Sequence, residues 1–371
     1  MARTKRPPAK VDRGDAAVKI PAASDQPSTL SDNRGRALLY LILLLAACLC
    51  LYRLGTVPRG FYCDEGMDGN NAREVLETGH PKVFYPENNG REGLYINLAT
   101  PFVYLLGNTI WAMRLPSALF GILTVWVVYM LGANLFSTPI GLLAAFFTAT
   151  STWHMHSSRL TNRANAVPFF LTCTLYLVLE GFKRLRTDRP YALRIALAGA
   201  VYGLGFHTYI AYRVTPLLAG GVFVYYFFRS RRTRAGPFWK ASGCFAASAA
   251  AVASPLVFYF ASHPDAFLGR SSQVSVFKKA DAAGEVIDHI WQFAQMFFLN
   301  GDPDWRQNFS GRPALFWPVA IFFATGIAIA VVELIGSLRR RAKLRIGFRF
   351  GMALGWIATG ALPVAAAMRS S

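Results

Sequence analysis

Charged residues are scarce in this chain. Asp, Glu, Lys and Arg make up 16% of its 371 residues, whereas a soluble globular domain carries about a quarter. This scarcity excludes an ordinary soluble enzyme. Acidic residues are rarer than basic residues, with 20 Asp and Glu against 39 Lys and Arg. A net charge of +19 would indicate a nucleic-acid partner in a soluble protein, but here the basic residues separate long apolar runs, so we expect no nucleic-acid partner.

Cysteine and histidine are also rare, with five Cys and six His. The odd number of scattered cysteines fits neither a disulfide framework nor a metal-binding quartet. His154 and His156 are two residues apart, so they point to different faces of a helix and would need distant partners to hold a metal. We therefore expect no metal and no cofactor. A divalent cation at Asp64, Glu65 and Asp68 is the open alternative, because hard carboxylates suit magnesium or manganese.

Long apolar runs are what this chain has in abundance. Most contain roughly 16 to 23 residues, which is enough to cross about 30 Å of hydrocarbon at 1.5 Å per residue. The sequence therefore predicts an all-α polytopic membrane protein. The candidate spans are 37–54, 94–107, 113–132, 139–154, 166–181, 191–207, 212–228, 241–260, 314–336 and 347–367.

The basic residues predict the orientation, because Lys and Arg accumulate in short cytoplasmic loops. Loops 182–194, 229–240 and 339–349 carry five, five and six basic residues, and the N-terminal tail carries eight. These segments share one side of the membrane only if 94–107 does not cross. That segment is short and contains Pro101, so we expect a helix in the outer leaflet. The prediction is nine crossings of the cytoplasmic membrane with the N-terminus inside.

The chain divides into a tail and a membrane domain. Residues 1–36 contain Pro and Ser without apolar periodicity, which predicts a disordered basic cytoplasmic tail before a transmembrane domain at 37–371. The long outer loops are then 55–112 and 261–313. Each contains apolar residues at helical spacing, which favours an amphipathic helix on the outer membrane surface.

Two polar clusters in the first outer loop are candidate functional residues. Asp64 and Glu65 directly follow the first span, where adjacent carboxylates are costly to desolvate, although a solvated loop pair explains them equally well. Arg91 and Glu92 precede the segment 94–107. Arg91 has the planar geometry to clamp a phosphate, but anchoring the helix by snorkelling is the favoured interpretation from the residues alone.

A third cluster contains Arg159 and Arg163, which are four residues apart and share one helix face. Two such cations repel each other unless an anion lies between them, so the spacing indicates a phosphate site. Further polar residues on the predicted outer side are possible substrate-binding residues: His207, Tyr209, Arg213, Arg270, Asp302, Arg306 and Asn308. A membrane-boundary aromatic belt explains the tyrosine equally well, and turn formation explains the late Gly- and Pro-rich segment.

Together these motifs resemble the GT-C membrane glycosyltransferases. The Asp-Glu pair after the first span, the Gly-Arg-Glu sequence at 90–92, the segment from Arg159 to Arg163 and the Gly-Asp-Pro run at 301–303 carry the resemblance. They are similar to the bacterial relatives of protein O-mannosyltransferases and of the lipid A aminoarabinose transferase, glycosyltransferase family 39. The resemblance covers 37–367 and implies a GT-C-type bundle of about nine crossings with amphipathic helices on the outer face.

The resemblance also implies an activity and roles. It implies an inverting transfer of one sugar from a polyprenyl-phosphate donor to an acceptor hydroxyl of unknown class, outside the cytoplasmic membrane. By that analogy Asp64 is the general base and Glu65 shapes the site, while Arg91, Arg159 and Arg163 bind the donor phosphate. The late loop matches only loosely. Family members usually continue through further spans, so the chain looks short at its C-terminus.

Two other functions are compatible with the sequence. One is a non-catalytic lipid or solute transporter, although transporters place ionisable groups near the bilayer midplane and here these groups collect on one face. The other is an inactive truncated remnant or assembly partner, which the short C-terminus keeps open.

Overall fold

The computed structural model describes residues 33–230, 235–267, 288, 291–292, 294–301, 311–339, 348–349 and 351. Four of the predicted substrate-binding residues lie outside these residues, namely Arg270, Asp302, Arg306 and Asn308. Most of the last candidate span, 347–367, lies outside them as well.

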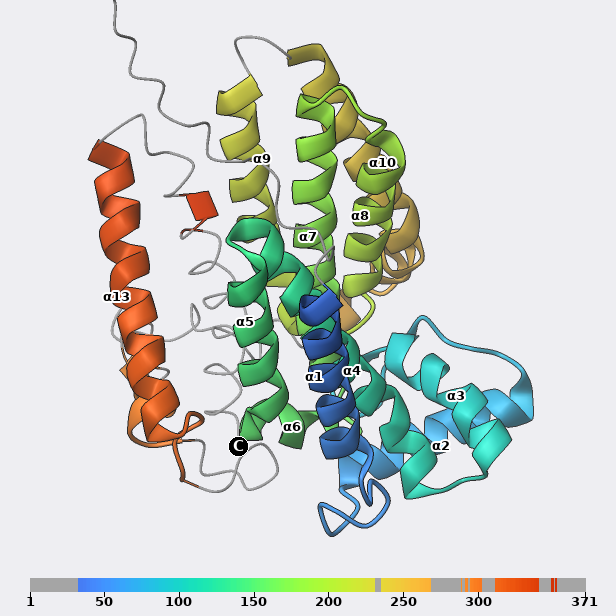
Figure 1. The fold of residues 1–371 in the computed structure, drawn as a ribbon. Helices are drawn as coiled ribbons and strands as arrows, with labels where there is room; N and C mark the ends of the chain where they lie inside the picture. Colours follow the sequence, from blue (N-terminus) through green and yellow to red (C-terminus); the bar gives the residue numbers. More distant parts are fainter. Residues whose placement is uncertain are drawn as a thin grey trace, which may run out of the picture.

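The described chain is almost entirely helical (Figure 1). The helices are α1 Asn33–Leu51, α2 Cys63–Thr78, α3 Leu94–Leu106, α4 Ile110–Leu135, α5 Thr138–Thr150, α6 Thr152–Ser158, α7 Ala166–Arg186, α8 Ala192–Gly205, α9 Pro216–Ser230, α10 Ala235–Ser262 and α13 Trp317–Arg339. Short 3-10 turns occupy Arg163–Asn165 and Ile210–Val214. Two strands of two residues, β1 Phe84–Tyr85 and β2 Arg91–Glu92, pair antiparallel, with Phe84 opposite Glu92 and Tyr85 opposite Arg91.

The predicted class, an all-α membrane protein, is confirmed apart from this small ribbon. Within the described residues, six helical segments are long and apolar enough to cross a membrane. They are Asn33–Leu51, Ile110–Leu135, Arg163–Arg186, Ile210–Phe228, Ala235–Ser262 and Trp317–Gly336. The helices α3, α5 and α8 are apolar but shorter, so the number of nine crossings stays a prediction.

Two predicted boundaries were wrong. The first candidate span was expected at 37–54, whereas α1 runs from Asn33 to Leu51. The candidate span 139–154 is divided at Ser151 into α5 and α6. The hydroxyl of Ser151 accepts a hydrogen bond from the backbone N–H of His154 and caps the new helix, so a hydroxyl residue at the break point starts a second helix.

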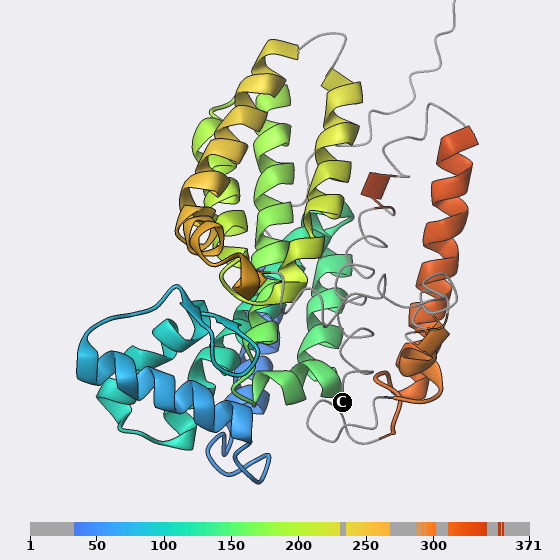
Figure 2. The same ribbon diagram turned by 180° about the vertical axis from the view of Figure 1, so that it is seen from behind.

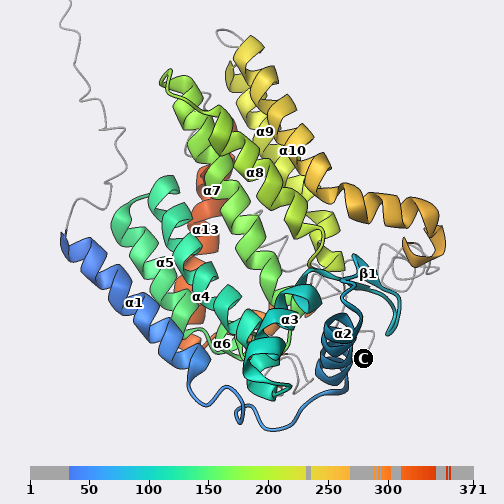
Figure 3. The ribbon, with the colours of Figure 1, turned by 90° about the vertical axis from the view of Figure 1, so that its right-hand side faces the viewer.

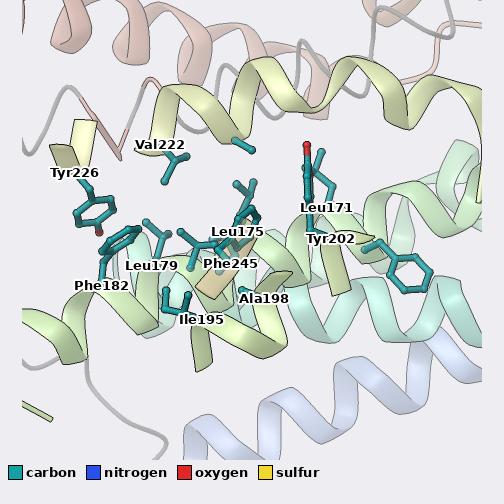
Figure 4. Close-up of a cluster of buried hydrophobic side chains, with 14 of the residues drawn as sticks. Leu171, Leu175, Leu179, Phe182, Ile195, Ala198, Tyr202, Val222, Tyr226 and Phe245 are labelled. Atoms are coloured by element: carbon teal, nitrogen blue, oxygen red, sulfur yellow. The ribbon is translucent and has the colours of Figure 1, made fainter. Parts of the chain in front are cut away.

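The largest apolar core lies between α7, α8, α9 and α10. Figure 4 shows Leu171, Leu175, Leu179 and Phe182 on one face of α7, because residues four apart lie one above the other on a helix. They pack against the facing side chains of the other three helices: Ile195, Ala198, Tyr202, Val222, Tyr226 and Phe245. A Cβ at Gly203 of α8 would lie 2.6 Å from the carbonyl oxygen of Ala249, so glycine permits the close approach of α8 and α10.

The polar segments gather at one end of this bundle. Figures 1 and 2 show α2, α3 and the β-ribbon beside that end, and Figure 3 shows α1, α4 and α5 side by side to the left of α2 and α3. A second apolar core joins the two outer helices to the start of α4, through Ala72 and Val75 of α2, Tyr95 and Ile96 of α3, and Met113 of α4. The segment 94–107, expected as a non-crossing helix, is therefore packed against α2 as α3.

Candidate active site

The chain between α1 and α2 has no helix or strand, and buried arginines hold its backbone. Arg159, at the end of α6, is 6% exposed. Its guanidinium donates hydrogen bonds to the carbonyl oxygens of Leu49 at 2.5 Å, Tyr52 at 2.5 Å and Val57 at 3.0 Å. These bonds satisfy carbonyls at and beyond the C-terminal end of α1 that have no helical partner. The geometry therefore gives Arg159 a role in fixing the exit of the chain from the first helix.

Arg114, near the start of α4, is fully buried and fixes the next part of the same segment. It donates to the carbonyl oxygens of Leu54, Pro58 and Gly60 at 3.3, 3.0 and 2.7 Å. It also binds both carboxylate oxygens of Glu65, with Nε 3.0 Å from Oε1 and Nη2 2.9 Å from Oε2. Arg114 thus connects the irregular segment to the first turn of α2.

Glu65 is a buried structural carboxylate at the N-terminus of α2. Besides Arg114, it accepts hydrogen bonds from the backbone N–H groups of Thr161 at 2.7 Å and Tyr62 at 3.2 Å. Burial alone would raise the pKa of Glu65, but the hydrogen bonds from Arg114 and from the N–H of Thr161 outweigh it and hold the pKa below its usual value. Glu65 is therefore ionised at neutral pH, and its oxygens are occupied by protein donors.

Asp64, its neighbour, has the opposite environment because successive helix residues point about 100° apart. The side chain of Asp64 is exposed. Its Oδ1 accepts a hydrogen bond of 2.7 Å from the side-chain amide of Asn88, which lies in the turn between β1 and β2. Of the two adjacent carboxylates, Asp64 is the one that a substrate can reach.

One helical turn after Asp64, a buried ion pair connects α2 to the β-ribbon. Asp68 and Arg91 are both almost fully buried. Arg91 Nη1 lies 2.5 Å from Asp68 Oδ1, and Arg91 Nη2 donates to the side-chain carbonyl of Asn71. Residues 64, 68 and 71 lie at i, i+4 and i+7 on one face of α2. The ribbon contacts this face, with Asn88 bound to Asp64 and with Arg91 bound to Asp68 and Asn71.

Two further arginines extend this cluster. Arg163, at the start of the 3-10 turn before α7, has Nε 3.9 Å from Asp68 Oδ2 and Nη1 3.7 Å from Glu92 Oε2. Arg213 has Nη2 3.4 Å from Glu92 Oε1. The ring of Tyr209 lies 6.0 Å from the guanidinium carbon of Arg163, within the range of a cation–π contact. The cluster thus combines side chains from α2, β2 and the two 3-10 turns.

The cluster pairs three arginines with three carboxylates. The guanidinium groups of Arg91, Arg163 and Arg213 lie within 4 Å of the carboxylates of Asp68 and Glu92, and Glu87, which is 45% exposed, lies 3.9 Å from Arg91 Nη2. Among the buried side-chain atoms of the described chain, Arg163 Nη1 and Arg91 Nε are two that have no hydrogen-bond partner. Burial raises the pKa of Asp68, although Arg163 and Arg91 act in the opposite direction. The cluster therefore keeps N–H donors for a further hydrogen-bond acceptor.

Comparison with known proteins places this geometry in a structural context. Residues 95–259 match the family model described as dolichyl-phosphate-mannose-protein mannosyltransferase. The archaeal oligosaccharyltransferase AglB from Archaeoglobus fulgidus, in complex with an inhibitory peptide and a dolichol-phosphate, aligns with a TM-score of 0.57 and 13% identity. The apo form of the Archaeoglobus fulgidus oligosaccharyltransferase aligns with a TM-score of 0.56 and 14% identity. The chain has the GT-C fold.

The alignments cover most of this chain but a smaller share of each aligned protein. The GT-C alignment covers 92% of this chain but 50% of the AglB chain and 51% of the apo oligosaccharyltransferase chain, so the chain spans about half their length. ArnT from Cupriavidus metallidurans, bound to undecaprenyl phosphate, aligns with a TM-score of 0.48 and 16% identity, over 92% of this chain and 60% of that chain. A comparison with curated proteins finds no significant match.

The GT-C fold brings several of the predicted site residues together. Arg91, Arg163 and Arg213 lie in one connected set of ion pairs, and Tyr209 lies beside Arg163. Asp64 lies one helical turn before this set and contacts Asn88 of the same ribbon. Other predicted residues lie elsewhere. The Nε2 atom of His207 is 3.0 Å from the carbonyl oxygen of Val252 in α10, and the donors of Arg159 are bound to backbone carbonyls.

Sequence reasoning missed several residues that build this site. Arg114 stands inside the apolar run 113–132, where a charged side chain is itself a signal of function. Asn71 carried no recognisable signal. Asn88 begins an Asn-Asn-Gly sequence, a known turn pattern that places its side chain next to Asp64 only once the ribbon has formed.

The acidic side chains of α2 do not form a common metal-binding group. In the part of the chain that the structure describes, no group of three or more His, Cys, Asp or Glu side chains lies close enough together to hold a metal ion. Asp64, Glu65 and Asp68, the alternative considered from the sequence, point to different partners, because Glu65 binds Arg114 while Asp68 binds Arg91. Metal-independence stays a prediction.

Proposed function

We propose that the protein is an inverting glycosyltransferase that moves one sugar from a polyprenyl-phosphate donor to an acceptor hydroxyl. The observation that carries the proposal is the position of the exposed Asp64 one helical turn from a cluster of three arginines, two of which keep a buried N–H group without a hydrogen-bond partner. The family description of residues 95–259 names a dolichyl-phosphate sugar donor. The AglB complex contains a dolichol-phosphate, which supports the same class of donor.

In this reaction Asp64 is the general base. Its carboxylate takes the proton of the acceptor hydroxyl, and the acceptor oxygen attacks the anomeric carbon of the sugar. The bond between that carbon and the phosphate oxygen breaks with its electron pair going to the phosphate. A single displacement forms the new bond on the opposite face of the sugar, so the configuration at the anomeric carbon inverts.

The arginine cluster stabilises the leaving phosphate. Arg163 Nη1, which has no hydrogen-bond partner, and the guanidinium of Arg213 are the donors best suited to an incoming phosphate, because Arg91 already holds Asp68 and Asn71. Charge that develops on the leaving group is stabilised most by donors that are already fixed in place. Arg159 contributes from a distance, by holding the backbone before α2.

The site is proposed to lie on the outer face of the cytoplasmic membrane. Arg163 immediately precedes α7, a helix of 21 residues that ends in Lys183, Arg184 and Arg186. At 1.5 Å per residue this helix is about 31 Å long, the thickness of the hydrocarbon core. The basic end fits the cytoplasmic side, which leaves the site on the other side and the N-terminus inside the cell.

A donor panel tests the proposal. Membranes that contain the protein are incubated with labelled polyprenyl-phosphate sugars and a mixture of acceptors, and release of label from the lipid is followed. We expect one donor to be consumed by the wild type, and Asp64→Asn to lower the rate roughly 10²- to 10⁴-fold. Glu77→Gln, an exposed carboxylate on the same helix, is the matched control and keeps its rate.

Two outcomes of this experiment contradict the proposal. Full activity of Asp64→Asn excludes Asp64 as the base, and release of no label from any donor in the panel contradicts transferase activity. A third arm contains EDTA, in which turnover is expected to continue because guanidinium groups neutralise the phosphate. Loss of turnover with rescue by manganese shows instead that a divalent cation is required.

A further inference from the structure

We propose that Asn88 is a positioning residue that fixes the carboxylate of Asp64 for proton transfer; this inference rests on the function proposed above. The side-chain amide of Asn88 donates to Asp64 Oδ1 at 2.7 Å, although the two residues are 24 positions apart in the chain. Asp64 lies at the N-terminus of α2, whereas Asn88 lies in the turn of the ribbon. The contact is therefore made by the tertiary structure and not by helix geometry.

The backbone of this turn is unusual. Asn88, Asn89 and Gly90 have φ values of 53°, 62° and 84°, so three consecutive residues occupy the left-handed region. Non-glycine residues adopt this conformation at a cost, which asparagine bears more easily than most. At Gly90 a Cβ would lie 2.5 Å from Cζ of Phe84, so only glycine closes the turn. Strained backbone of this kind persists where the surrounding structure holds it firmly.

The base of the ribbon provides that support. The ring of Phe84 packs against Tyr259 and Phe260 at the end of α10, with ring centroids 5.1 and 5.2 Å apart. On the following residue, the hydroxyl of Tyr85 donates to the side-chain oxygen of Asn97 in α3 at 3.0 Å. The ribbon is thus anchored to two helices, and its tip contacts α2 through the bond from Asn88 to Asp64.

This arrangement determines how the base faces the acceptor. The amide of Asn88 engages Oδ1 of Asp64, and within the described chain Oδ2 accepts no hydrogen bond, so it is available to a hydroxyl. Without the amide, an exposed aspartate at a helix terminus exchanges among several rotamers, and fewer encounters are productive. The same ribbon carries Arg91, which binds Asp68, so one element sets the position of both the base and the phosphate cluster.

Three variants test this role in the full-length protein. Asn88→Gly keeps the left-handed backbone and removes the amide, so strain does not explain its effect. Asn88→Asp keeps the size but places a second carboxylate beside Asp64, and two carboxylates in contact disfavour double ionisation. Asn89→Gly, at the next exposed left-handed position, is the matched control. For each we measure kcat, KM for the donor, the pH profile of kcat and the thermal unfolding midpoint.

The expected pattern separates positioning from folding. Asn88→Gly lowers kcat about tenfold, the effect of one charge-assisted hydrogen bond, with an unchanged donor KM. Asn88→Asp lowers kcat at neutral pH and moves the acidic limb of the pH profile to higher pH. Asn89→Gly retains the wild-type kcat. If the wild type is active and both Asn88 variants keep its kcat, the positioning role is overturned and the proposed function is not. A pH profile of Asn88→Asp in which kcat is lower at every pH, without a shift of the acidic limb, has the same consequence. A wild type inactive with every donor overturns the proposed function, and the positioning role with it.

Discussion

Arg114 and Glu65 form a buried two-point ion pair that joins α4 to α2. The two side chains are 0% and 3% exposed, and they are 49 residues apart in the sequence. A planar guanidinium matches the two oxygens of a carboxylate, so the pair specifies orientation as well as proximity. Its position next to Asp64 means that the first turn of α2 is set by a residue in an adjacent helix.

We predict that Arg114→Met destabilises the protein strongly. Removal of one partner leaves the Glu65 charge buried without compensation, which costs about 3 to 5 kcal/mol. The measurement is the thermal unfolding midpoint of the purified protein in detergent. Arg73→Met is the control, because Arg73 forms a pair with Glu77 on the same helix whose side chains are 65% and 59% exposed, and such pairs contribute little. Equal midpoints for the two variants would show that the buried pair does not stabilise the fold.

A second prediction concerns pH. The folded protein lowers the pKa of Glu65 below its ordinary value of 4.5, so below that value the unfolded state binds more protons than the folded state. The stabilisation by Glu65 is complete above about pH 4.5 and is lost as the pH falls through the folded pKa. Glu65→Gln should therefore have a lower unfolding midpoint than the wild type at pH 7, and the difference should shrink below about pH 4.5. A difference that stays constant from about pH 7 to pH 3.5 would contradict a lowered pKa for Glu65.

Arg163 and Arg159 are predicted to differ in what they contribute. Arg163→Gln removes an N–H group without a hydrogen-bond partner from the arginine cluster. Binding of the lipid donor should weaken about 10- to 100-fold, the range for hydrogen bonds to charged groups. Arg159→Gln removes the donors to three backbone carbonyls, so its main effect should be a lower unfolding midpoint. Lipid-phosphate binding and thermal unfolding are measured on both variants. Stronger loss of binding in Arg159→Gln than in Arg163→Gln would reverse the assignment.

The predicted topology is testable with cysteine labelling. Cys63 is exposed at the start of α2 and is expected on the outer face, whereas Arg186 ends α7 on the expected cytoplasmic face. A protein that keeps only Cys63 should react with an impermeant reagent in intact cells. A cysteine-free protein with Arg186→Cys should react only after the membrane is permeabilised. Labelling of the second protein in intact cells would contradict the nine-crossing arrangement.

The sequence predicted the fold class better than the details of the site. Apolar runs identified the helices, because backbone groups inside a membrane must be hydrogen-bonded within the helix. The helix expected at 94–107 is present as α3, and its position outside the set of crossing helices stays a prediction. The sequence analysis did not predict the break at Ser151, because a single hydroxyl residue within an apolar run is not a specific signal for the start of a new helix. The start of α1 was placed too late, because polar residues such as Asn33 extend a helix beyond its apolar part.

Within the site, the residue types were predictable but their partners were not. The resemblance gave Asp64 the role of base and Glu65 that of shaping the site, but the residues themselves did not show which carboxylate is accessible. The packing of α4 and of the loop before α7 leaves Asp64 exposed and binds Glu65 to protein donors. The spacing of Arg159 and Arg163 suggested one shared anion, yet Arg159 faces the end of α1. Contacts over more than 90 residues, such as that of Thr161 with Glu65, leave no local signature.

The two arginines that bind the backbone before α2 also have a dynamic consequence. Arg114 and Arg159 together bind six carbonyl groups, at the end of α1 and along the irregular segment that follows it. The conformational entropy of this segment is therefore lost when the protein folds. A substrate that reaches Asp64 meets a preorganised surface, so its binding energy is not spent on ordering the chain.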